Sequence, residues 1–478
     1  MFTLFTMMTA VYVIFLFALV LTTNAQCVSD ADLAHIAAAG KRALEANERY
    51  TAATQSELGG LPFDFRFAPA NYSGSGVNPS SRYVVPRIGP WLEGDLGGDS
   101  FLNWGVGEVS PLTSREALVV LMCTPPPLRL WTLEMAILYR MNKTNPLAFQ
   151  SPGASISNTV NSATLGPAAK TNEPLLVIVT ADRNTEADVK KAFKNITNVA
   201  TIVINGTADL LHFGTHPLKE GCDIFQLCMR VHASPAQAKA SAFAAYLGRR
   251  FPLLLVKPSF AAADAPLYPI ADRAMRVGPT TEVGLTARRA VLRDAVVKRM
   301  QSAQLELRTT VAFSPVELDK RRCLLDPEYR PYGTGNCFGT SSDGRYTLSH
   351  PYTLPAGNLS SLVLVVIGAN HAATGNAADN QLLHDTKVSV NPEGMEGSAQ
   401  FYLGPAATPA DAGLFAFAFT ESCADQTLLG RFCAVVDQPK GGAAGALLRL
   451  EAYLDNESGT RPSLGLVHPL ALVFTASA

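Results

Sequence analysis

The stretch EPLLVIVTADRNTEADVKKAF, residues 173–193, contains an apolar run that is followed at once by an amphipathic helix pattern. The six residues from Leu175 to Thr180 predict a buried strand. Asn184 or Thr185 then offers the side-chain oxygen that caps a helix. Apolar residues at helical spacing predict the buried face of that helix: Val189, Ala192, Phe193 and Ile196. The segment therefore predicts a strand and helix unit packed against a core.

The segments that follow continue this pattern. Apolar runs predict strands over residues 199–204, 224–231 and 251–257. Before the last of these, a Ser-Pro pair at residues 234–235 provides the cap and first position that helix starts prefer. The order strand, helix, strand, strand, helix, strand is that of the split βαβ, or ferredoxin-like, module. We therefore expect an α/β module over residues 114–258.

Two further strands at the start of this module are separated by a stiff corner. Residues 118–123 form a short apolar run, and large apolar residues alternate with smaller or polar ones over residues 131–139. The prolines from Pro125 to Pro127 fix an extended backbone and remove ladder donors, which excludes a regular tight hairpin. This corner holds Arg129 near the end of a strand.

The rest of the chain divides into three parts around this module. Residues 26–113 predict an N-terminal helix and a Gly/Pro-rich wrapping segment, and residues 259–330 a linker and an amphipathic helix over 286–307. Residues 331–478 predict an antiparallel β-sandwich or jelly-roll-like domain, which makes the whole chain α+β. The expected strands of this domain are residues 362–367, 386–390, 399–403, 414–420, 431–436, 447–454 and 464–474.

The first 25 residues form an apolar segment of signal-peptide length that ends in the small residues Thr23-Asn24-Ala25. No Lys or Arg precedes the apolar run, so an uncleaved anchor is the alternative. No later segment is long and apolar enough to cross a bilayer. We expect cleavage, a mature chain that starts near Gln26, and a secreted or lumenal protein without membrane contact once the leader is removed.

Cysteine usage agrees with the secretory route. The eight cysteines include three pairs of neighbours and two that remain for a long-range bridge. The expected disulfides are Cys222 with Cys228, Cys323 with Cys337, Cys423 with Cys433, and Cys27 with Cys123. No CxxC spacing exists, so we expect no metal and no cofactor.

Six acceptor sequons for N-glycosylation lie along the chain. They are at Asn71, Asn142, Asn195, Asn205, Asn358 and Asn456. Beside a leader and paired cysteines, they predict an extracellular or lumenal glycoprotein whose loops at these positions face solvent.

Composition and motifs exclude several classes of function. A net charge of -1 with 17% charged residues disfavours a nucleic-acid partner, and it leaves the oligomeric state open. The chain contains no GxSxG elbow, HExxH motif, Walker loop or dinucleotide fingerprint. The sequence therefore names no reaction.

Two polar strand ends remain as candidate catalytic positions. The guanidinium group of Arg129 can bind a carboxylate, a phosphate or a backbone carbonyl, although it can equally tie down the proline corner. His371 can act as a general acid or base beside Asn370, whose amide can donate to an oxyanion. The alternative for this second position is a polar turn in which His371 is bonded to backbone.

These segments, taken in order, resemble a family of secreted, largely uncharacterised proteins of algae, fungi and bacteria. The resemblance covers residues 115–440 and implies no activity, since none is assigned to that family. It rests on CTPPPLRLW (123–131), NTVNS (158–162), VTADRNTEADVKKAF (179–193), SSDGRYTL (341–348) and GANHAATG (368–375). Family members continue the last element with a basic and an aromatic residue, where this chain has Asn376-Ala377-Ala378-Asp379.

Two function classes follow from these observations. One is a secreted protein that binds or processes a small anionic or ester ligand in a pocket between the α/β module and the β domain. The residues expected in that pocket are Arg129, Asn158, Asn161, Asn370 and His371. The other is an extracellular structural, adhesion or binding glycoprotein without catalytic activity, in which these residues only brace the domain junction.

Overall fold

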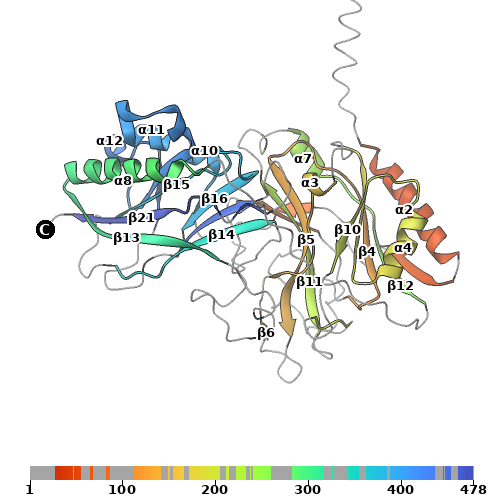
Figure 1. The fold of residues 1–478 in the computed structure, drawn as a ribbon. Coiled ribbons are helices and arrows are strands. Elements are labelled where there is room, and N and C mark those ends of the chain that lie inside the picture. Colours follow the sequence, from red (N-terminus) through yellow and green to blue (C-terminus); the bar gives the residue numbers. More distant parts are fainter. Residues whose placement is uncertain are drawn as a thin grey trace, which may run out of the picture.

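A computed structural model describes residues 27–476 with internal gaps. The larger gaps are residues 58–64, 68–81, 87–111, 142–148, 166–171, 205–210, 215–221, 260–281, 327–342, 355–361, 437–444 and 454–460. The expected leader, most of the wrapping segment, and Cys323 with Cys337 lie outside the described residues. Figure 1 shows that helices and strands form two lobes side by side. The first lobe comprises residues 27–259 and the second lobe residues 282–476.

The first lobe contains a five-stranded sheet with the order β1-β12-β4-β9-β10. Its strands are β1 (Tyr50–Thr54), β4 (Ala117–Cys123), β9 (Pro174–Thr180), β10 (Val199–Val203) and β12 (Leu253–Pro258). Only β9 and β10 are parallel, and they are connected through α4 (Arg183–Ala192), as the strand and helix pattern predicts. Asp182, rather than Asn184 or Thr185, caps α4, because its carboxylate accepts from the N–H groups of both residues.

Helix α2 (Asp30–Glu45) packs beside α4 on this sheet (Figure 1). A capping box starts α2: the side chain of Ser29 accepts from the N–H of Asp32, and the Asp32 carboxylate accepts from the N–H of Ser29. The expected N-terminal helix is therefore present, directly after Cys27.

A second sheet of seven strands has the order β2-β3-β11-β5-β6, with two short strands also paired to β5. Its strands are β2 (Phe65–Phe67), β3 (Arg82–Pro86), β5 (Leu130–Met141), β6 (Phe149–Gln150), β7 (Ala154–Ser155), β8 (Val160–Asn161) and β11 (Asp223–His232). The short helices α3 (Ser162–Leu165) and α7 (Ser241–Leu247) flank it. One hydrophobic cluster contains buried residues of both sheets, so the two sheets and the helices form successive layers.

This arrangement differs from the single sheet of a ferredoxin-like module. Strands β9, β10 and β12 share one sheet, but β11 pairs with β5 along its whole length in the other sheet. The order of strands and helices along the chain was predicted correctly. Which strands pair depends on contacts between distant segments, and local periodicity does not encode them.

The second lobe is built on a nine-stranded sheet with the order β17-β16-β20-β14-β13-β21-β15-β18-β19. Its strands are β13 (Leu305–Val316), β14 (Gly344–Ser349), β15 (Val363–Ala369), β16 (Asp379–His384), β17 (Val388–Val390), β18 (Leu414–Thr420), β19 (Cys433–Val435), β20 (Leu448–Tyr453) and β21 (Leu470–Ala476). All pairs are antiparallel except β18 with β19. Five strands separate β16 from β18 in this order, yet the rings of His384 and Phe419 are 5.1 Å apart. The sheet is therefore strongly curled, instead of divided into the two sheets of a sandwich.

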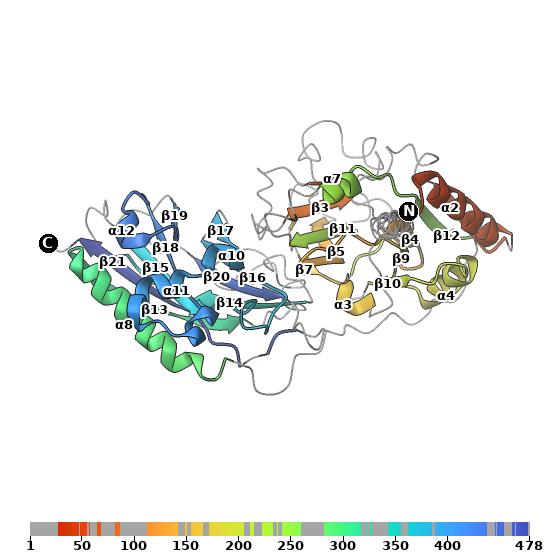
Figure 2. The ribbon, with the colours of Figure 1, turned by 90° about the horizontal axis from the view of Figure 1, so that it is seen from above.

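Helices cover one face of this sheet (Figures 1 and 2). They are α8 (Leu285–Ser302), α11 (Ser398–Leu403) and α12 (Gln426–Leu429). By contrast, α10 (Pro392–Met395) places Met395 in the hydrophobic cluster of the other face, which contains Leu364 and Val366. The amphipathic helix expected over residues 286–307 ends at Ser302, because Gln304 has a φ of 58° and Leu305 begins β13. Residues 399–403 were expected to form a strand, which is wrong. They lie in α11, whose Ala399, Tyr402 and Leu403 bury one helical face.

Two of the expected disulfides are present, Cys27–Cys123 and Cys423–Cys433. The expected pair of Cys222 and Cys228 is wrong. Cys222 directly precedes β11 and Cys228 lies within it. A strand advances about 3.3 Å per residue, so these residues are about 20 Å apart, whereas a disulfide joins Cα atoms within about 7 Å. No helix of the described residues has the length and apolar character needed to span a membrane.

Candidate functional site

The two faces of the β5–β11 pair differ in chemistry. Odd-numbered residues 131–137 of β5 and 225–231 of β11 lie in the hydrophobic core. Even-numbered residues point to the opposite face, which is polar and still buried. That face includes Thr132, Glu134, Cys228, Arg230 and His232. A polar strand face that is shielded from water is unusual, and it must find its hydrogen-bonding partners within the protein or in a bound molecule.

Strands of the second lobe cover this face. The hydroxyl of Tyr453 on β20 accepts a hydrogen bond from Nη1 of Arg230 at 3.4 Å, and the Tyr453 ring lies 4.8 Å from that of His232. Asp379 and Gln381 on β16 lie in register with Tyr453 and Glu451 of β20. Hereafter the junction cluster denotes Arg129, Glu134, Arg230, His232, Asp343, Asp379, Gln381, Glu393, Arg449, Glu451 and Tyr453.

Arg129 links the two lobes through ion pairs. Its Nη1 donates to Oδ1 of Asp379 at 3.1 Å and to Oε2 of Glu393 at 2.9 Å, and its Nη2 donates to Oε1 of Glu393. Burial alone would lower the pKa of Arg129, but Glu393 and Asp379 raise it above its ordinary value. The proline corner thus presents a permanent positive charge to two carboxylates, which leaves Arg129 committed to holding the lobes together.

His232 forms a buried contact between the lobes. Its Nδ1 lies 2.6 Å from Oδ2 of Asp379, and both side chains are almost fully buried. Nε2 of Gln381 donates to the same carboxylate oxygen at 2.9 Å. Asp379 therefore orients the imidazole ring of His232, the arrangement that positions a histidine for acid–base work.

Three side-chain atoms on the polar face have no hydrogen-bonding partner among the described residues: Thr132 Oγ1, Glu134 Oε2 and Ser155 Oγ. The other carboxylate oxygen of Glu134 lies 2.6 Å from Nε of Arg230. Ser155 on β7 is opposite Ala136 of β5, so it shares the face of Thr132 and Glu134. These three atoms form a row of unfulfilled polar groups along the buried surface of the first lobe.

Cys228 is the nucleophilic residue type on this face, but it is not activated. Burial raises the pKa of its thiol to about 12, so the thiolate is absent at neutral pH. Covalent catalysis by Cys228 is therefore disfavoured.

The two asparagines of the NTVNS segment bind different parts of the molecule. Asn161 donates from Nδ2 to Oδ2 of Asp343 at 2.8 Å, and Thr159 donates from Oγ1 to the other oxygen of that buried carboxylate. Asp343 directly precedes β14, so this contact also joins the two lobes. Asn158 instead binds β10, where its Nδ2 donates to the carbonyl of Thr201 at 2.9 Å. Of the two asparagines predicted to bind ligand, Asn161 contacts the junction cluster and Asn158 does not.

His371 belongs to a separate group around the buried carboxylate of Glu282. Nδ1 of His371 lies 2.8 Å from Oε1 of Glu282, which also accepts from Thr374 Oγ1 at 2.7 Å and from Asn376 Nδ2 at 3.3 Å. The backbone N–H of Val467 donates to Oε2 at 2.8 Å. Burial alone would raise the pKa of Glu282, but the charge of His371 and these hydrogen bonds hold it below its ordinary value. We call these five residues the Glu282 cluster.

Asn370 connects the turn after β15 to the junction cluster. Its Oδ1 accepts from the N–H of Ala373 at 3.2 Å, and its Nδ2 donates to the carbonyl of Pro392 at 3.1 Å. Pro392 starts α10 and precedes Glu393, the partner of Arg129. The two predicted strand ends therefore meet at α10 through Asn370 and Arg129, whereas His371 bonds to a side-chain carboxylate of its own cluster.

Sequence reasoning gave no role to His232, Glu134 or Arg230. The signal was present in the alternation of β11, where polar residues occupy every second position up to His232. Glu134 on β5 and Arg230 on β11 carry opposite charges on the same polar face, an arrangement that indicates a buried second interface. Asp379 and Glu451, which complete this interface, lie more than a hundred residues away in sequence.

Other predicted positions are partly outside the described residues. Asn195 is exposed just after α4, where a glycan could be carried, and the remaining five sequons lie in undescribed segments. Among the residues that the structure describes, no group of three His, Cys, Asp or Glu side chains is arranged to hold a metal ion.

Comparison with known proteins gives only distant similarities. No family model matches the chain, and no curated protein does. A solved structure of an uncharacterised protein from Burkholderia cenocepacia covers 93% of this chain and 96% of its own, at 11% identity and a TM-score of 0.36. A structural genomics target from Vibrio parahaemolyticus covers 93% of this chain and 100% of its own, at 10% identity and a TM-score of 0.34. Similarity at this level carries no information on activity.

Proposed function

We propose that this chain is a secreted, disulfide-bonded N-glycoprotein that binds a small, uncharged, hydroxyl-bearing ligand between its two lobes. The observation that carries the proposal is the row of three buried polar atoms without partners, Thr132 Oγ1, Glu134 Oε2 and Ser155 Oγ. Leaving a buried polar group unsatisfied costs about 1–3 kcal/mol. Three such groups on one strand face are most simply explained by a molecule that bonds to them.

The chemistry of these atoms and of their surroundings selects the ligand class. The carboxylate oxygen of Glu134 needs a donor, and the two hydroxyls can both donate and accept, so a ligand hydroxyl suits all three. Within the junction cluster, five carboxylates (Glu134, Asp343, Asp379, Glu393 and Glu451) face three guanidinium groups (Arg129, Arg230 and Arg449). This excess of negative charge disfavours the anionic ligand expected from the sequence, because the positive group proposed to bind it, Arg129, is already paired.

The extracellular location in this proposal is supported by the disulfides and by one sequon. Cys27–Cys123 and Cys423–Cys433 are bridges of the kind that persist in oxidising compartments. Asn195, the sequon residue that the structure describes, is exposed. Release of the protein from a secreting host tests the extracellular location. A loss of mass on glycosidase treatment tests the glycosylation.

Binding can be tested by thermal shift with small polyols and neutral sugars, using small carboxylates as the contrasting set. We expect a neutral polyol to raise the melting temperature of the wild type and of a Thr310→Val control, whose threonine is exposed on β13. Thr132→Val keeps the side-chain shape but removes a junction hydroxyl, and we expect it to lose the shift. A response only to carboxylates, or an unchanged response of Thr132→Val, would overturn the proposal. A chain that responds to nothing fits the structural glycoprotein instead.

An acid–base reaction on the same ligand is the second candidate function. It is favoured by the contact of His232 Nδ1 with the Asp379 carboxylate, which fixes the orientation of the ring. Once a ligand is identified, His232→Gln should still bind it but should not convert it. Equal turnover by wild type and variant would exclude this role.

A further inference from the structure

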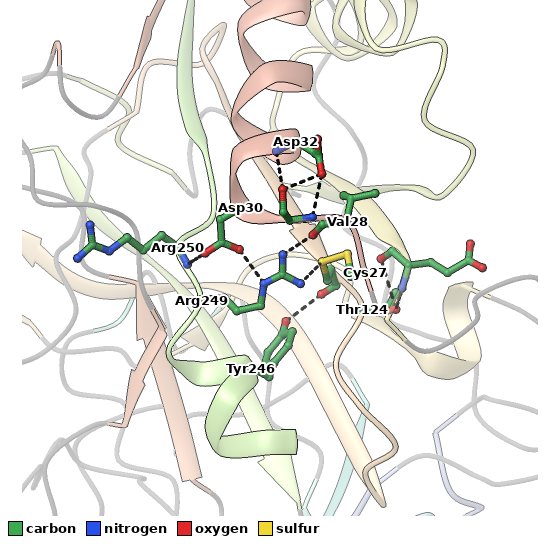
Figure 3. Close-up of a disulfide and its surroundings, with 11 residues drawn as sticks. Cys27, Val28, Asp30, Asp32, Thr124, Tyr246, Arg249 and Arg250 are labelled. Carbon is green, nitrogen blue, oxygen red and sulfur yellow. Dashed lines mark hydrogen bonds and ion pairs between the residues drawn. A yellow bond between two sulfur atoms is a disulfide. The ribbon is translucent and has the colours of Figure 1, made fainter. Parts of the chain in front are cut away.

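The disulfide between Cys27 and Cys123 has an unusual electrostatic environment (Figure 3). Cys123 ends the central strand β4 and is fully buried, whereas Cys27 is partly exposed and lies just before α2. Nη1 of Arg249 lies 2.9 Å from Sγ of Cys123. The two cysteines therefore differ: Cys27 is partly exposed, and Cys123 is buried with its sulfur against a guanidinium group.

Arg249 is held in this position by two further contacts. Its Nε donates to Oδ1 of Asp30 at 2.8 Å, and its Nη2 donates to the carbonyl of Val28 at 2.6 Å. Tyr246 fixes the other side of the site, since its hydroxyl donates to the carbonyl of Cys123 at 2.9 Å. Each contact orients the guanidinium fork or the cysteine, so the positive charge stays at the sulfur atom.

We propose that small extracellular dithiols reduce the Cys27–Cys123 disulfide by attacking Cys27 and not Cys123. We call this disulfide the clasp. A dithiol thiolate attacks Sγ of Cys27, the Sγ–Sγ bond breaks, and Cys123 leaves as a thiolate that keeps the electron pair of the bond. The second dithiol thiolate then displaces Cys27, which takes a proton from solvent. The dithiol is thereby oxidised to its own disulfide, and two electrons pass to the two cysteines.

Arg249 speeds this step because a thiolate leaves faster when the pKa of its thiol is lower. A neighbouring guanidinium group stabilises a thiolate and lowers the pKa of its thiol. Attack at Cys27 is favoured by exposure, since Cys27 is partly exposed whereas Cys123, the last residue of β4, is fully buried. By contrast, no donor contacts either sulfur of Cys423–Cys433 among the described residues, and both of its cysteines are partly exposed.

Opening the clasp has a local effect. It removes the covalent link between Cys27 and β4, while Val28 keeps its hydrogen bond to Arg249 and α2 stays anchored by Leu33 and Leu44, which are buried in the core of the first lobe. The clasp thus changes the tether between the N-terminal segment and β4 without unfolding the lobe.

The test measures the opening rate of each disulfide in the folded, secreted protein. Dithiothreitol is added without denaturant, free thiols are alkylated over time, and peptide mass spectrometry follows each pair, with Cys423–Cys433 as the reference in the same molecule. We expect Arg249→Gln to slow the opening of Cys27–Cys123 about fivefold relative to this reference. Arg249→Lys, which keeps the positive charge, should restore most of the rate.

Arg250→Gln is the matched control, because the Arg250 side chain is exposed and points away from the disulfide in Figure 3. In the Arg250→Gln variant, Cys27–Cys123 should open at the wild-type rate. In a separate experiment with glutathione, the mixed disulfide should form at Cys27. The proposal is overturned if Arg249→Gln and Arg250→Gln open equally fast, if Arg249→Gln opens faster, or if glutathione is found on Cys123. Melting temperatures measured before reduction confirm that each variant is folded.

Discussion

The surroundings of His468 lower the pKa of its imidazole. Burial, together with the positive charges of His371, Arg345 and Arg289, lowers its pKa from an ordinary value of 6.5 to about 4, against the opposing effect of Glu282. Between these two pH values the unfolded chain binds a proton at His468 that the folded chain does not bind. Stability therefore falls as the pH is lowered through this window.

We predict that the midpoint of urea unfolding decreases from pH 6.5 to pH 4 and that His468→Asn makes this decrease smaller. His350→Asn, a change at an exposed histidine outside the Glu282 cluster, should leave the decrease as in the wild type. Glu282 acts at lower pH: its pKa is depressed, so the stability it contributes is lost only as the pH falls below its ordinary value of 4.5. Identical pH profiles for wild type and His468→Asn would contradict the assignment.

At the same scale, individual side chains show what the sequence could predict. The prolines place Arg129 at a strand end, as expected, but its partners Asp379 and Glu393 lie 250 and 264 residues away. His371 does end a strand, yet its partner Glu282 precedes it by 89 residues in a segment that gave no signal. Residue type and local pattern indicate that a side chain is special, while its partner is decided by the tertiary fold.

Among the elements, the contact of α2 with α4 depends on a glycine. A Cβ on Gly40 would overlap the buried ring of Phe193, which follows α4. Within a helix, alanine is more favourable than glycine by about 1 kcal/mol. An added methyl group that crowds a packed core costs about 1–3 kcal/mol. The close approach of the two helices therefore requires the missing side chain.

We predict that Gly40→Ala lowers the free energy of unfolding by about 1 kcal/mol, measured by urea denaturation. Gly284→Ala is the matched control, since Gly284 has a φ of -77° and no atom within 4 Å of an added Cβ. It should leave stability unchanged or slightly higher. If both substitutions have the same effect, α2 and α4 are packed differently from this description.

Two short apolar runs of the first lobe were predicted well from the sequence, and one short stretch of the second lobe was not. The strand expected over residues 175–180 is β9, from Pro174 to Thr180, and the one over 199–204 is β10, from Val199 to Val203. Residues 399–403 were assigned to a strand because so short a stretch, with four apolar or small residues and one glutamine, fits either period. The assignment of β11 to the second sheet could not be predicted, because pairing partners are set by long-range contacts.

For the molecule as a whole, the junction between the lobes brings together segments on which the resemblance to the secreted family rests. CTPPPLRLW contributes Arg129, which pairs with Asp379 a few residues after GANHAATG. NTVNS contributes Asn161, which bonds to Asp343 of SSDGRYTL. CTPPPLRLW, NTVNS and SSDGRYTL thus contribute residues to one buried polar interface, whereas His371 of GANHAATG bonds to Glu282 in a separate cluster.

We predict that Arg129→Ala lowers the free energy of unfolding by about 3 kcal/mol, because it leaves Asp379 buried without its guanidinium partner. Arg293→Ala removes an exposed pair with Asp294 and should cost less than about 1 kcal/mol. Urea denaturation of both variants measures the difference. Equal losses would show that the Arg129 pairs do not stabilise the junction.

The most direct test of ligand binding between the lobes is a crystal structure of the secreted protein soaked with the polyol that gives the largest thermal shift. We predict electron density for that molecule within hydrogen-bonding distance of Thr132 Oγ1 and Glu134 Oε2, the unpartnered atoms of the junction face. Density for water alone at these atoms, or for protein groups that already satisfy them, would contradict the proposed binding site.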